Sequence, residues 1–498
     1  MRTGSVGRAR ATRWIASGVV AAGLGLVVGQ AQQPTTREHP ELQQFFLVMA
    51  EDAEVARAAV ERIGDGWRDG YAGMLWDMMR FMTPPREERP LQPAAGGDPS
   101  AFGEPPPLSS EPEHPSTVVF RRLQGLLADS TGERFGNDIM RWQQWIWDQT
   151  YDPHPEYGAF KGAWYRQIDP RFALFFPPGV NSLIRLDEID WGGVPPNGIP
   201  PLRYPDHVPA DEATYLDDDN IVFGIEVNGE ARAYPKRILA WHEMSVDGVG
   251  GVDLTIVYCT LCGTVIPYES ITDGRHIRFG TSGLLYRSNK LMFDDETNSL
   301  WSTLEGIPVV GELAGSGLEL TRRSMVTTTW GAWHERHPET TVLTLDTGFE
   351  RDYSEGAAYR DYFATDDLMF QVQAHDGRLD NKAEVVVMLL DDPAGADRHP
   401  VALSTEFLAE RPVFQTEVAG QSFVVVTSPS GASRIYEAED RAFEGLDGDR
   451  VLDRAGGGWA ITEEELVADD GTRLPRLSAH RAFWFGWFAQ FPETALFQ

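Results

Sequence analysis

Residues 252–269, VDLTIVYCTLCGTVIPYE, hold the only two cysteines of the chain, Cys259 and Cys262. The run before the first thiol, 254–258, is β-branched and aromatic, which predicts a buried strand with Cys259 at its end. The residues after the second thiol, 264–266, are again mostly β-branched, so the chain returns to extended structure. We therefore expect the cysteine pair in a turn between two strands.

A C-x-x-C spacing can chelate a metal or close a small disulfide ring. In thioredoxin-like sites the second cysteine lies in the first turn of a helix, whose dipole lowers the thiolate pKa. The residues after Cys262 disfavour a helix, and Gly263 completes a C-x-x-C-G turn that resembles half of a rubredoxin or zinc-ribbon knuckle. A second knuckle is missing, so a metal here would need other ligands.

Length and charge narrow the class of protein. The 498 residues predict roughly three domains at about 150 residues each. The formal net charge of −32 argues against nucleic acid and anionic membrane surfaces as partners.

Residues 1–31 have the layout of a secretory signal peptide. Four arginines precede an apolar run, 14–28, and small residues follow it at the cleavage positions. The alternative is an uncleaved N-terminal anchor; beyond this segment we expect no stable membrane span. The signal predicts an extracytoplasmic protein, periplasmic or secreted, and vicinal thiols tend to be oxidised there.

Residues 38–160 predict short helices, interrupted by a proline-rich loop at 83–115. The segment TGERFGNDIMRWQQWIWDQ, 131–149, resembles a HEAT-like repeat. Helical repeats often present concave surfaces, so this region either binds a protein partner or packs against the rest of the chain. Residues 161–211 are expected to connect it to the remainder of the chain.

The next segment predicts a hairpin and a helix before the cysteine strand. Residues 222–227 and 230–234 alternate in hydropathy around Asn228-Gly229, which is a strong hairpin signal. Pro235 then opens a helix, KRILAWHEM, that leads to the cysteines.

The chain matches itself at a distance of 168 residues, because 255–269 aligns with 423–437. Cys259 then falls on Thr427 and Cys262 on Ser430, while a W-x-x-W and a P-E-T motif recur downstream of both stretches. The sequence thus predicts an α+β fold: an all-α, HEAT-like front, then two tandem copies of a β-rich α+β unit, 212–345 and 378–498. Shared motifs are most simply structural, and features of the first copy alone are candidates for function.

The first copy resembles the bacterial and archaeal family known as domain of unknown function 3179. The resemblance rests on RILAWHEM (237–244), VYCTLCGTVIPYE (257–269), FGTSGLLYRSNKLMFDDETNSLWS (279–302) and the aromatic ending AFWFGWFAQFPET (482–494). The family usually has proline after the first cysteine, where this chain has Thr260, which loosens the expected knuckle geometry. No established activity comes with membership, so the resemblance implies candidate residues but no reaction, and it leaves open whether the protein is an enzyme.

The candidate metal ligands are Cys259, Cys262 and His242, with Glu243 beside them. Two thiolates, an imidazole and a carboxylate suit zinc, iron or copper, and Met244 adds a thioether if the metal is copper. The alternative for His242 is a hydrogen-bonded core residue. Cys259, Cys262 and Glu243 are also the catalytic candidates, and the alternative for Glu243 is a capping or solvated carboxylate.

A second candidate set offers hydroxyl and amide groups to a ligand. It consists of Tyr258, Ser282, Tyr286, Ser288 and Asn289. Four of these residues lie in the glycine-rich segment FGTSGLLYRSN, whose alternative interpretation is an ordinary tight turn.

Three functions of different class remain open. The first is an extracytoplasmic metal-binding or thiol-redox protein centred on Cys259 and Cys262. The second is a non-enzymatic ligand- or protein-binding module in which the two cysteines form a structural disulfide. A serine hydrolase is the weakest, because no G-x-S-x-G elbow accompanies a suitable histidine.

Overall fold

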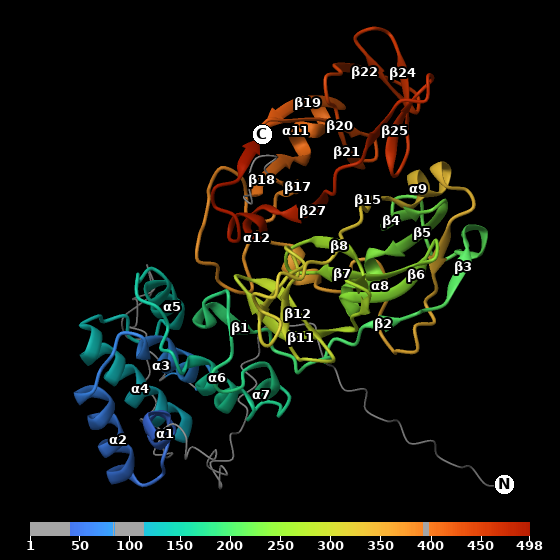
Figure 1. Cartoon of the computed structure of the whole chain (residues 1–498). Coiled ribbons are helices and arrows are strands. Elements are labelled where there is room, and N and C mark those ends of the chain that lie inside the picture. Colours follow the sequence, from blue (N-terminus) through green and yellow to red (C-terminus); the bar gives the residue numbers. More distant parts are fainter. Residues whose placement is uncertain (1–39, 83, 85–113, 392–397) are drawn as a thin grey trace, which may run out of the picture. The chain divides into compact units, whose positions relative to one another are not determined.

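The computed structural model describes residues 40–82, 84, 114–391 and 398–498. The predicted signal segment and most of the proline-rich loop lie outside these ranges. Within them, no helix is both long and apolar enough to cross a membrane. The chain forms two compact units, one ending at Val180 and including Ile184–Glu188, the other comprising Asn181–Leu183 and Ile189–Gln498 (Figure 1).

The first unit is helical, as the apolar periodicity predicts. Asp52 caps the second helix by accepting two backbone N–H bonds, and Gly132 ends the fourth in a left-handed conformation. Two helices of this unit, α6 and α7, reach into the stretch expected to be a connector. The helices are α1 (Pro40–Leu47), α2 (Ala53–Asp65), α3 (Tyr71–Met79), α4 (Pro115–Thr131), α5 (Ile139–Trp147), α6 (Tyr157–Tyr165), α7 (Phe172–Phe175) and the 3-10 helix η2 (Leu186–Glu188).

A fully buried ion pair lies in the core of the helical unit. The Lys161 ammonium is 2.7 Å from Asp77 Oδ2, and the hydroxyls of Tyr157 and Tyr165 donate to the same carboxylate. Because every partner is hydrogen-bonded, this cluster stabilises the contact of α3 with α6 without leaving an unpaired charge.

The second unit is built from sheets in which most neighbouring strands are antiparallel. One sheet has the order β15-β4-β5-β16-β3, in which β16 runs parallel to β5. Another has the order β27-β17-β18-β28, and β28 runs parallel to β18. The bounds are β3 (His207–Pro209), β4 (Ile221–Val227), β5 (Glu230–Pro235), β15 (Val326–Thr329), β16 (Thr341–Leu343), β17 (Glu384–Asp391), β18 (Arg398–Ser404), β27 (His480–Phe483) and β28 (Ala495–Phe497).

Two further sheets have the orders β2-β6-β7-β8 and β19-β20-β21. The cysteines lie at the end of β7, so the strand predicted before them is confirmed. The bounds are β2 (Leu202–Arg203), β6 (Met244–Val249), β7 (Val252–Cys259), β8 (Thr264–Glu269), β19 (Val413–Val418), β20 (Gln421–Thr427) and β21 (Ser433–Glu437).

Two five-stranded sheets and a short ribbon complete the unit; in the first sheet, β1 pairs with the meander β11-β12-β13-β14. The orders are β1-β11-β12-β13-β14 and β22-β23-β24-β25-β26, with β9 paired to β10. The bounds are β1 (Ile189–Trp191), β9 (Ile271–Thr272), β10 (Arg275–His276), β11 (Phe279–Tyr286), β12 (Asn289–Asp294), β13 (Leu300–Ser302), β14 (Pro308–Val310), β22 (Phe443–Asp447), β23 (Arg450–Asp453), β24 (Gly458–Ile461), β25 (Glu465–Ala468) and β26 (Arg473–Pro475).

The helices of this unit are short and each connects strands. They are η3 (Ala210–Glu212), α8 (Lys236–His242), α9 (Trp330–Arg336), α10 (Arg360–Phe363), α11 (Thr405–Glu410) and α12 (Trp484–Phe488). The molecule is thus mixed α+β, with a helical N-terminal part and a β-rich C-terminal part, as predicted.

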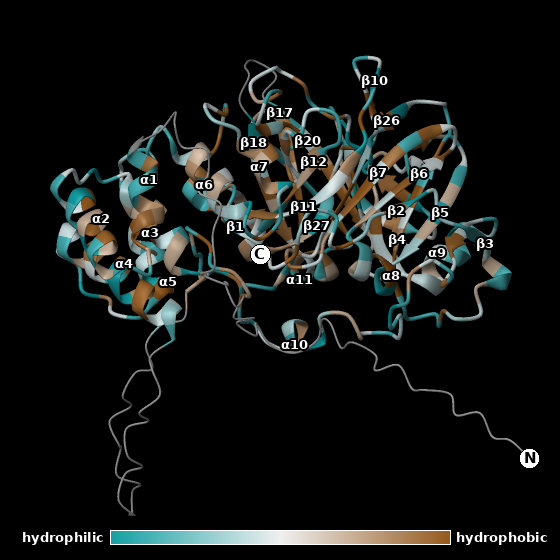
Figure 2. Ribbon diagram, turned by 90° about the horizontal axis from the view of Figure 1, so that it is seen from below, coloured by the Kyte–Doolittle hydropathy of each residue, from teal (hydrophilic) through white to brown (hydrophobic). Residues whose placement is uncertain are grey.

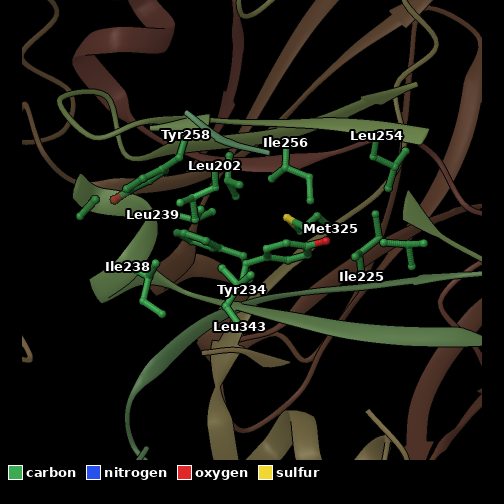
Figure 3. Packing of buried hydrophobic residues seen from close by; sticks show 14 of the residues in the cluster. Leu202, Ile225, Tyr234, Ile238, Leu239, Leu254, Ile256, Tyr258, Met325 and Leu343 are labelled. Carbon is green, nitrogen blue, oxygen red and sulfur yellow. The ribbon is translucent and has the colours of Figure 1, made fainter. Parts of the chain in front are cut away.

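Local signals position the cysteine strand. Asn228 and Gly229 both have positive φ, 50° and 80°, so they form the two-residue turn predicted between β4 and β5. Figure 3 shows Ile238 and Leu239 of α8 packed beside Tyr258 of β7 within one buried cluster. In Figure 2, strands of this unit carry much of the hydrophobic colouring, as expected where side chains are buried. The helix that ends at His242 is thereby fixed against the strand that ends at Cys259.

Candidate functional site

The cysteine turn is a tight reversal between antiparallel strands. Cys259 pairs with Thr264, and Gly263 adopts a φ of 62°, a conformation that favours glycine. The turn carries no helix after Cys262, which confirms the prediction from the residues on its C-terminal side and separates the site from thioredoxin-like ones.

Both thiols are free, buried and adjacent. Cys259 is 2% exposed and Cys262 is 0% exposed. Their sulfurs are 3.0 Å apart, with the Cys259 thiol donating to Cys262 Sγ, and the Cys262 thiol donates to the carbonyl of Ser288 at 3.2 Å. The two sulfurs are therefore close enough to form a disulfide with little movement.

The surroundings of the two thiols shift their pKa values in opposite directions. Burial alone raises the pKa of both. At Cys259 this is outweighed by the hydrogen bond between the two sulfurs and by one to the backbone of Lys290, so its pKa is lowered. At Cys262 the neighbouring Cys259 adds to burial and raises the pKa well above its usual value. The pKa values of the two thiols are thus shifted in opposite directions, because a charge on one sulfur disfavours a second charge on the adjacent buried sulfur.

A buried lysine and glutamate lie beside the thiols. Lys290 is 4% exposed and Glu243 is 7% exposed. Lys290 Nζ donates to the carbonyls of Glu243 at 2.5 Å and Tyr258 at 3.2 Å, and it lies 3.6 Å from Glu243 Oε2. Burial lowers the pKa of Lys290, although the charges of Glu243 and Cys259 oppose this. Glu243 itself ends α8 with a φ of 55°, which is unusual for a residue other than glycine.

Residues 353–363, which we call the tyrosine segment, lie over this site. Tyr353 bonds to His242 at 2.6 Å, Tyr359 donates to Glu243 Oε1 at 3.2 Å, and Tyr362 donates to the carbonyl of Leu261 at 2.7 Å. Phe363 and Tyr359 pack against the same hydrophobic cluster as the cysteines. This segment, which falls between the two predicted units, closes one side of the site.

The helix α12 closes another side. A Cβ at Gly486 would lie 3.1 Å from Cys262 Cβ and 3.4 Å from its sulfur, so glycine allows close approach of the helix. The backbone N–H of Phe483 donates to the carbonyl of Cys262 at 2.7 Å, and Asn289 Nδ2 donates to the carbonyl of Gly486 at 2.8 Å. Residues far apart in sequence therefore enclose the thiols.

His242 is engaged away from the sulfurs. It is fully buried, its Nδ1 donates to the carbonyl of Pro200 at 2.8 Å, and its Nε2 accepts from the hydroxyl of Tyr353 at 2.6 Å. Burial lowers the pKa of His242 to about 4, so the ring is neutral. The lone pair that would bind a metal is already used by Tyr353. The alternative interpretation, a hydrogen-bonded core histidine, describes this geometry.

The donor set does not fit a closed metal site. Among the residues described by the structure, no group of three or more histidine, cysteine, aspartate or glutamate side chains is arranged to hold an ion. Zinc, iron or copper would thus have two thiolates here without the further ligands that they require. The neighbouring Lys290 ammonium also disfavours a cation.

The predicted ligand-binding residues fall into two groups. Tyr258 points into the core against Phe223, and Ser282 holds a β-bulge in β11 by donating to the carbonyl of Leu291. Ser288 and Asn289 lie at the tip of the β11–β12 hairpin beside Cys262. The carbonyl of Tyr286, at the same tip, accepts from Gln490 at 3.0 Å. Ligand binding by these residues stays a prediction.

Sequence reasoning missed Lys290, Tyr359, Tyr362 and Gly486. A signal for the first was present, because the chain has only four lysines and Lys290 comes immediately after the hairpin tip. Two other lysines support the tyrosine segment: Lys382 Nζ lies 3.5 Å from the Tyr362 ring centroid and Lys236 Nζ lies 4.7 Å from that of Phe363. Three of the four lysines thus gather around the cysteine site.

The model of a protein family described as "Protein of unknown function (DUF3179)" matches residues 196–494. No curated protein matches the chain, and no solved structure does. The matched range contains the cysteine turn, Lys290, the tyrosine segment and α12, and it covers more than half of the sequence. The chain belongs to the DUF3179 family.

Proposed function

We propose that this protein is a thiol-redox protein in which Cys259 and Cys262 cycle between two thiols and one disulfide. The observation that carries the proposal is the pair of free sulfurs at 3.0 Å, one with a lowered and one with a raised pKa. A reactive thiolate beside a protonated partner is the arrangement that thiol–disulfide exchange uses, because the thiolate attacks and the second sulfur resolves the intermediate.

The geometry favours this function over metal binding. The two sulfurs need no further partner to form a disulfide. A metal needs further donors, and the described residues contain no group of three or more histidine, cysteine, aspartate or glutamate side chains that could hold one. The export signal predicted at residues 1–31 would place the couple in an oxidising compartment, where such pairs form disulfides.

The alternative, a structural disulfide in a binding module, predicts a bond that stays closed. A ring of four residues stabilises a fold by only about 2 kcal/mol through the unfolded state, which is little for a unit of this size. A permanently closed disulfide is not stabilised by a buried lysine–glutamate pair beside it. Because burying such a pair costs free energy, its presence here favours a functional role over a structural disulfide.

We also infer that residues 212–345 and 378–498 are two copies of one unit. The order and directions of β15-β4-β5-β16 match those of β27-β17-β18-β28. In both, an indole Nε1 donates to a carboxylate of a turn, from Trp301 to Asp294 and from Trp459 to Asp453. In this view the first copy keeps the chemistry, and the second covers it through α12.

The test is a thiol count on the folded full chain. After treatment with dithiothreitol and desalting, acid quenching and alkylation in denaturant should give two free thiols, and after treatment with 2-hydroxyethyl disulfide they should give none. A second reduction without denaturant should restore both. A Cys262→Ser variant should stop at one mixed disulfide on Cys259. If the wild-type thiols stay reduced in the folded chain, or the disulfide opens only on unfolding, the proposal fails.

A further inference from the structure

We propose that Glu243, held by Lys290 and Tyr359, is the internal proton acceptor of the dithiol. This inference rests on the proposed redox function and assigns to it residues that supply proton transfer. The geometry that supports it is a carboxylate whose two oxygens have different partners, the Tyr359 hydroxyl at 3.2 Å from Oε1 and the Lys290 ammonium at 3.6 Å from Oε2.

The need for such a group arises from burial. Closing the disulfide removes the proton of Cys262, whose side chain is fully buried and whose sulfur donates to the carbonyl of Ser288. A carbonyl accepts a hydrogen bond but does not take the proton. The largest electrostatic effects on Cys262 come from Cys259, Glu243 and Lys290, and burial raises the pKa of the neighbouring Tyr258 and Tyr362 so that their hydroxyls stay protonated. Of these, Glu243 is the group that can accept the proton of Cys262 while Cys259 stays available as the nucleophile.

The backbone at Glu243 is consistent with a functional constraint. Its φ of 55° costs free energy for a residue with a Cβ, and helices usually end in this conformation at glycine. Its backbone carbonyl accepts from Tyr258 N–H at 2.9 Å and from Lys290 Nζ. These two bonds tie the carboxylate-bearing residue directly to the strand that carries Cys259.

Lys290 and Tyr359 are positioning residues in this scheme. Lys290 fixes Glu243 and the end of β7 together, because its ammonium donates to the carbonyls of Glu243 and Tyr258 and lies 3.6 Å from Glu243 Oε2. Tyr359 orients Oε1 by donating to it. Its hydroxyl remains a donor across the ordinary pH range, since burial and the charge of Glu243 raise its pKa well above 10.

The reaction balances with a small disulfide, RS–SR, as oxidant. The Cys259 thiolate opens the RS–SR bond, forms Cys259–S–S–R and releases RS⁻, which takes a proton from solvent. The Cys262 sulfur then attacks the Cys259 sulfur while its proton moves to the Glu243 carboxylate. The second RS⁻ leaves and takes that proton from Glu243. Two thiols of the protein are oxidised, and one RS–SR is reduced to two RSH.

The experiment measures the pH profile of oxidation of the full chain by 2-hydroxyethyl disulfide. In Glu243→Gln we expect the rate at pH 7 to fall about 100-fold, which is within the usual range for loss of a general base. The loss should shrink about tenfold for each pH unit above 7, since hydroxide replaces the missing base. Tyr359→Phe should shift the profile in the same direction by about tenfold or less.

Two controls separate proton transfer from structure. Tyr436→Phe removes a buried hydroxyl of β21 that donates to the carbonyl of Thr462, outside the cysteine site, so its profile should match the wild type. Thermal unfolding identifies a variant that fails to fold. If Glu243→Gln fails to fold, the pH profile of Tyr359→Phe tests the role of Glu243 in its place.

Two results would overturn the inference. One is a Glu243→Gln rate that is unchanged or faster at pH 7, as expected if the carboxylate only repels thiolates. The other is a loss that is equal at every pH, as expected of a purely structural role. Failure of the wild type to cycle at all would instead reject the proposed function.

Discussion

Two regions of the β-rich unit share a strand order and differ in what their turns hold. At the end of β7, Cys259 and Cys262 form a buried dithiol. At the end of β20, Thr427 bonds to Ser433 at 2.9 Å and Ser430 bonds to Thr328 at 2.9 Å. The first turn contains thiols, which can be oxidised, and the second contains hydroxyls that only hydrogen-bond. The difference indicates that the sheets are scaffold and that function depends on what the turn carries.

The buried charges differ in the same way. In the first region one lysine and one glutamate lie beside the sulfurs. In the second, Glu463 is bonded by Arg434 and Arg476 and also by Arg336 of α9. A carboxylate with three guanidinium partners is suited to holding elements together, because each partner is charged and hydrogen-bonded. We therefore expect the two clusters to respond differently to mutation.

The largest effect should come from Glu463→Gln. Removing the charge leaves buried arginines unpaired, so the free energy of unfolding should fall by about 3–5 kcal/mol. Burial alone would raise the pKa of Glu463, but the charges of Arg434 and Arg476 hold it well below the usual value. The stabilisation of the fold by ionised Glu463 is therefore fully present above the ordinary glutamate pKa and is lost as the pH falls below that value.

Chemical denaturation measures this change, with the exposed Glu410→Gln as the matched control. If the account is right, the oxidation rate of the cysteines in folded Glu463→Gln equals that of the wild type. A fall in this oxidation rate as large as that expected for Glu243→Gln would contradict the proposed difference between the two clusters.

The buried histidines give the next effect. Burial lowers the pKa of His242 to about 4 and that of His480 to about 3, so both rings are neutral in the fold. A lowered folded pKa means that the stabilisation is complete above about pH 6.5 and is lost as pH falls towards these values. Between pH 7 and pH 4, each histidine should thus lower the free energy of unfolding by about 3 kcal/mol, at about 1.4 kcal/mol per unit of pKa difference. The free energy of unfolding should therefore depend less on pH between pH 7 and 4 in His242→Gln and in His480→Gln than in the wild type. An unchanged pH dependence would contradict the burial argument.

A reciprocal exchange tests how closely α12 approaches the cysteines. The W-x-x-W helix α9 has Ala332 where α12 has Gly486. Gly486→Ala brings a methyl group against Cys262 and should cost about 1–3 kcal/mol. Ala332→Gly meets no such contact and should cost about 0.5–1 kcal/mol through backbone entropy. Equal costs in urea denaturation would mean that α12 does not press on the thiol.

The smallest effect concerns the disulfide itself. Oxidation of the wild type should change the free energy of unfolding by about 2 kcal/mol or less, because the ring is short. Cys259→Ala/Cys262→Ala should remove that difference between oxidised and reduced samples. The double variant should still fold, as the second region folds without sulfur. Loss of the fold on reduction would instead favour a structural disulfide.

Much of the scaffold was predictable because its signals are local. The strand before Cys259, the Asn228-Gly229 turn and the helix after Pro235 all depend on residues close in sequence. The site was only partly predictable. The sequence predicted Cys259, Cys262 and Glu243 as site residues, and the structure brings them together. The ring of His242 points towards Pro200 and Tyr353 instead, because the packing of α8 decides its direction.

The remaining site residues come from distant segments. Tyr359 and Tyr362 belong to a stretch between the two expected units, and no periodicity or motif marks their hydroxyls as partners of Glu243 and Leu261. Gly486 has meaning only once α12 lies against Cys262. Such contacts depend on tertiary packing, which local pattern does not encode.

The most direct test of the central claim is the midpoint potential of the Cys259–Cys262 couple in the folded chain, measured by equilibration in dithiothreitol buffers and counting of thiols. A couple that cycles should have a midpoint above about −300 mV at pH 7, whereas structural disulfides lie below that value. A midpoint above this limit, with full reversibility, is the predicted result. A midpoint well below it would contradict the account and identify the bond as a fixed part of the scaffold.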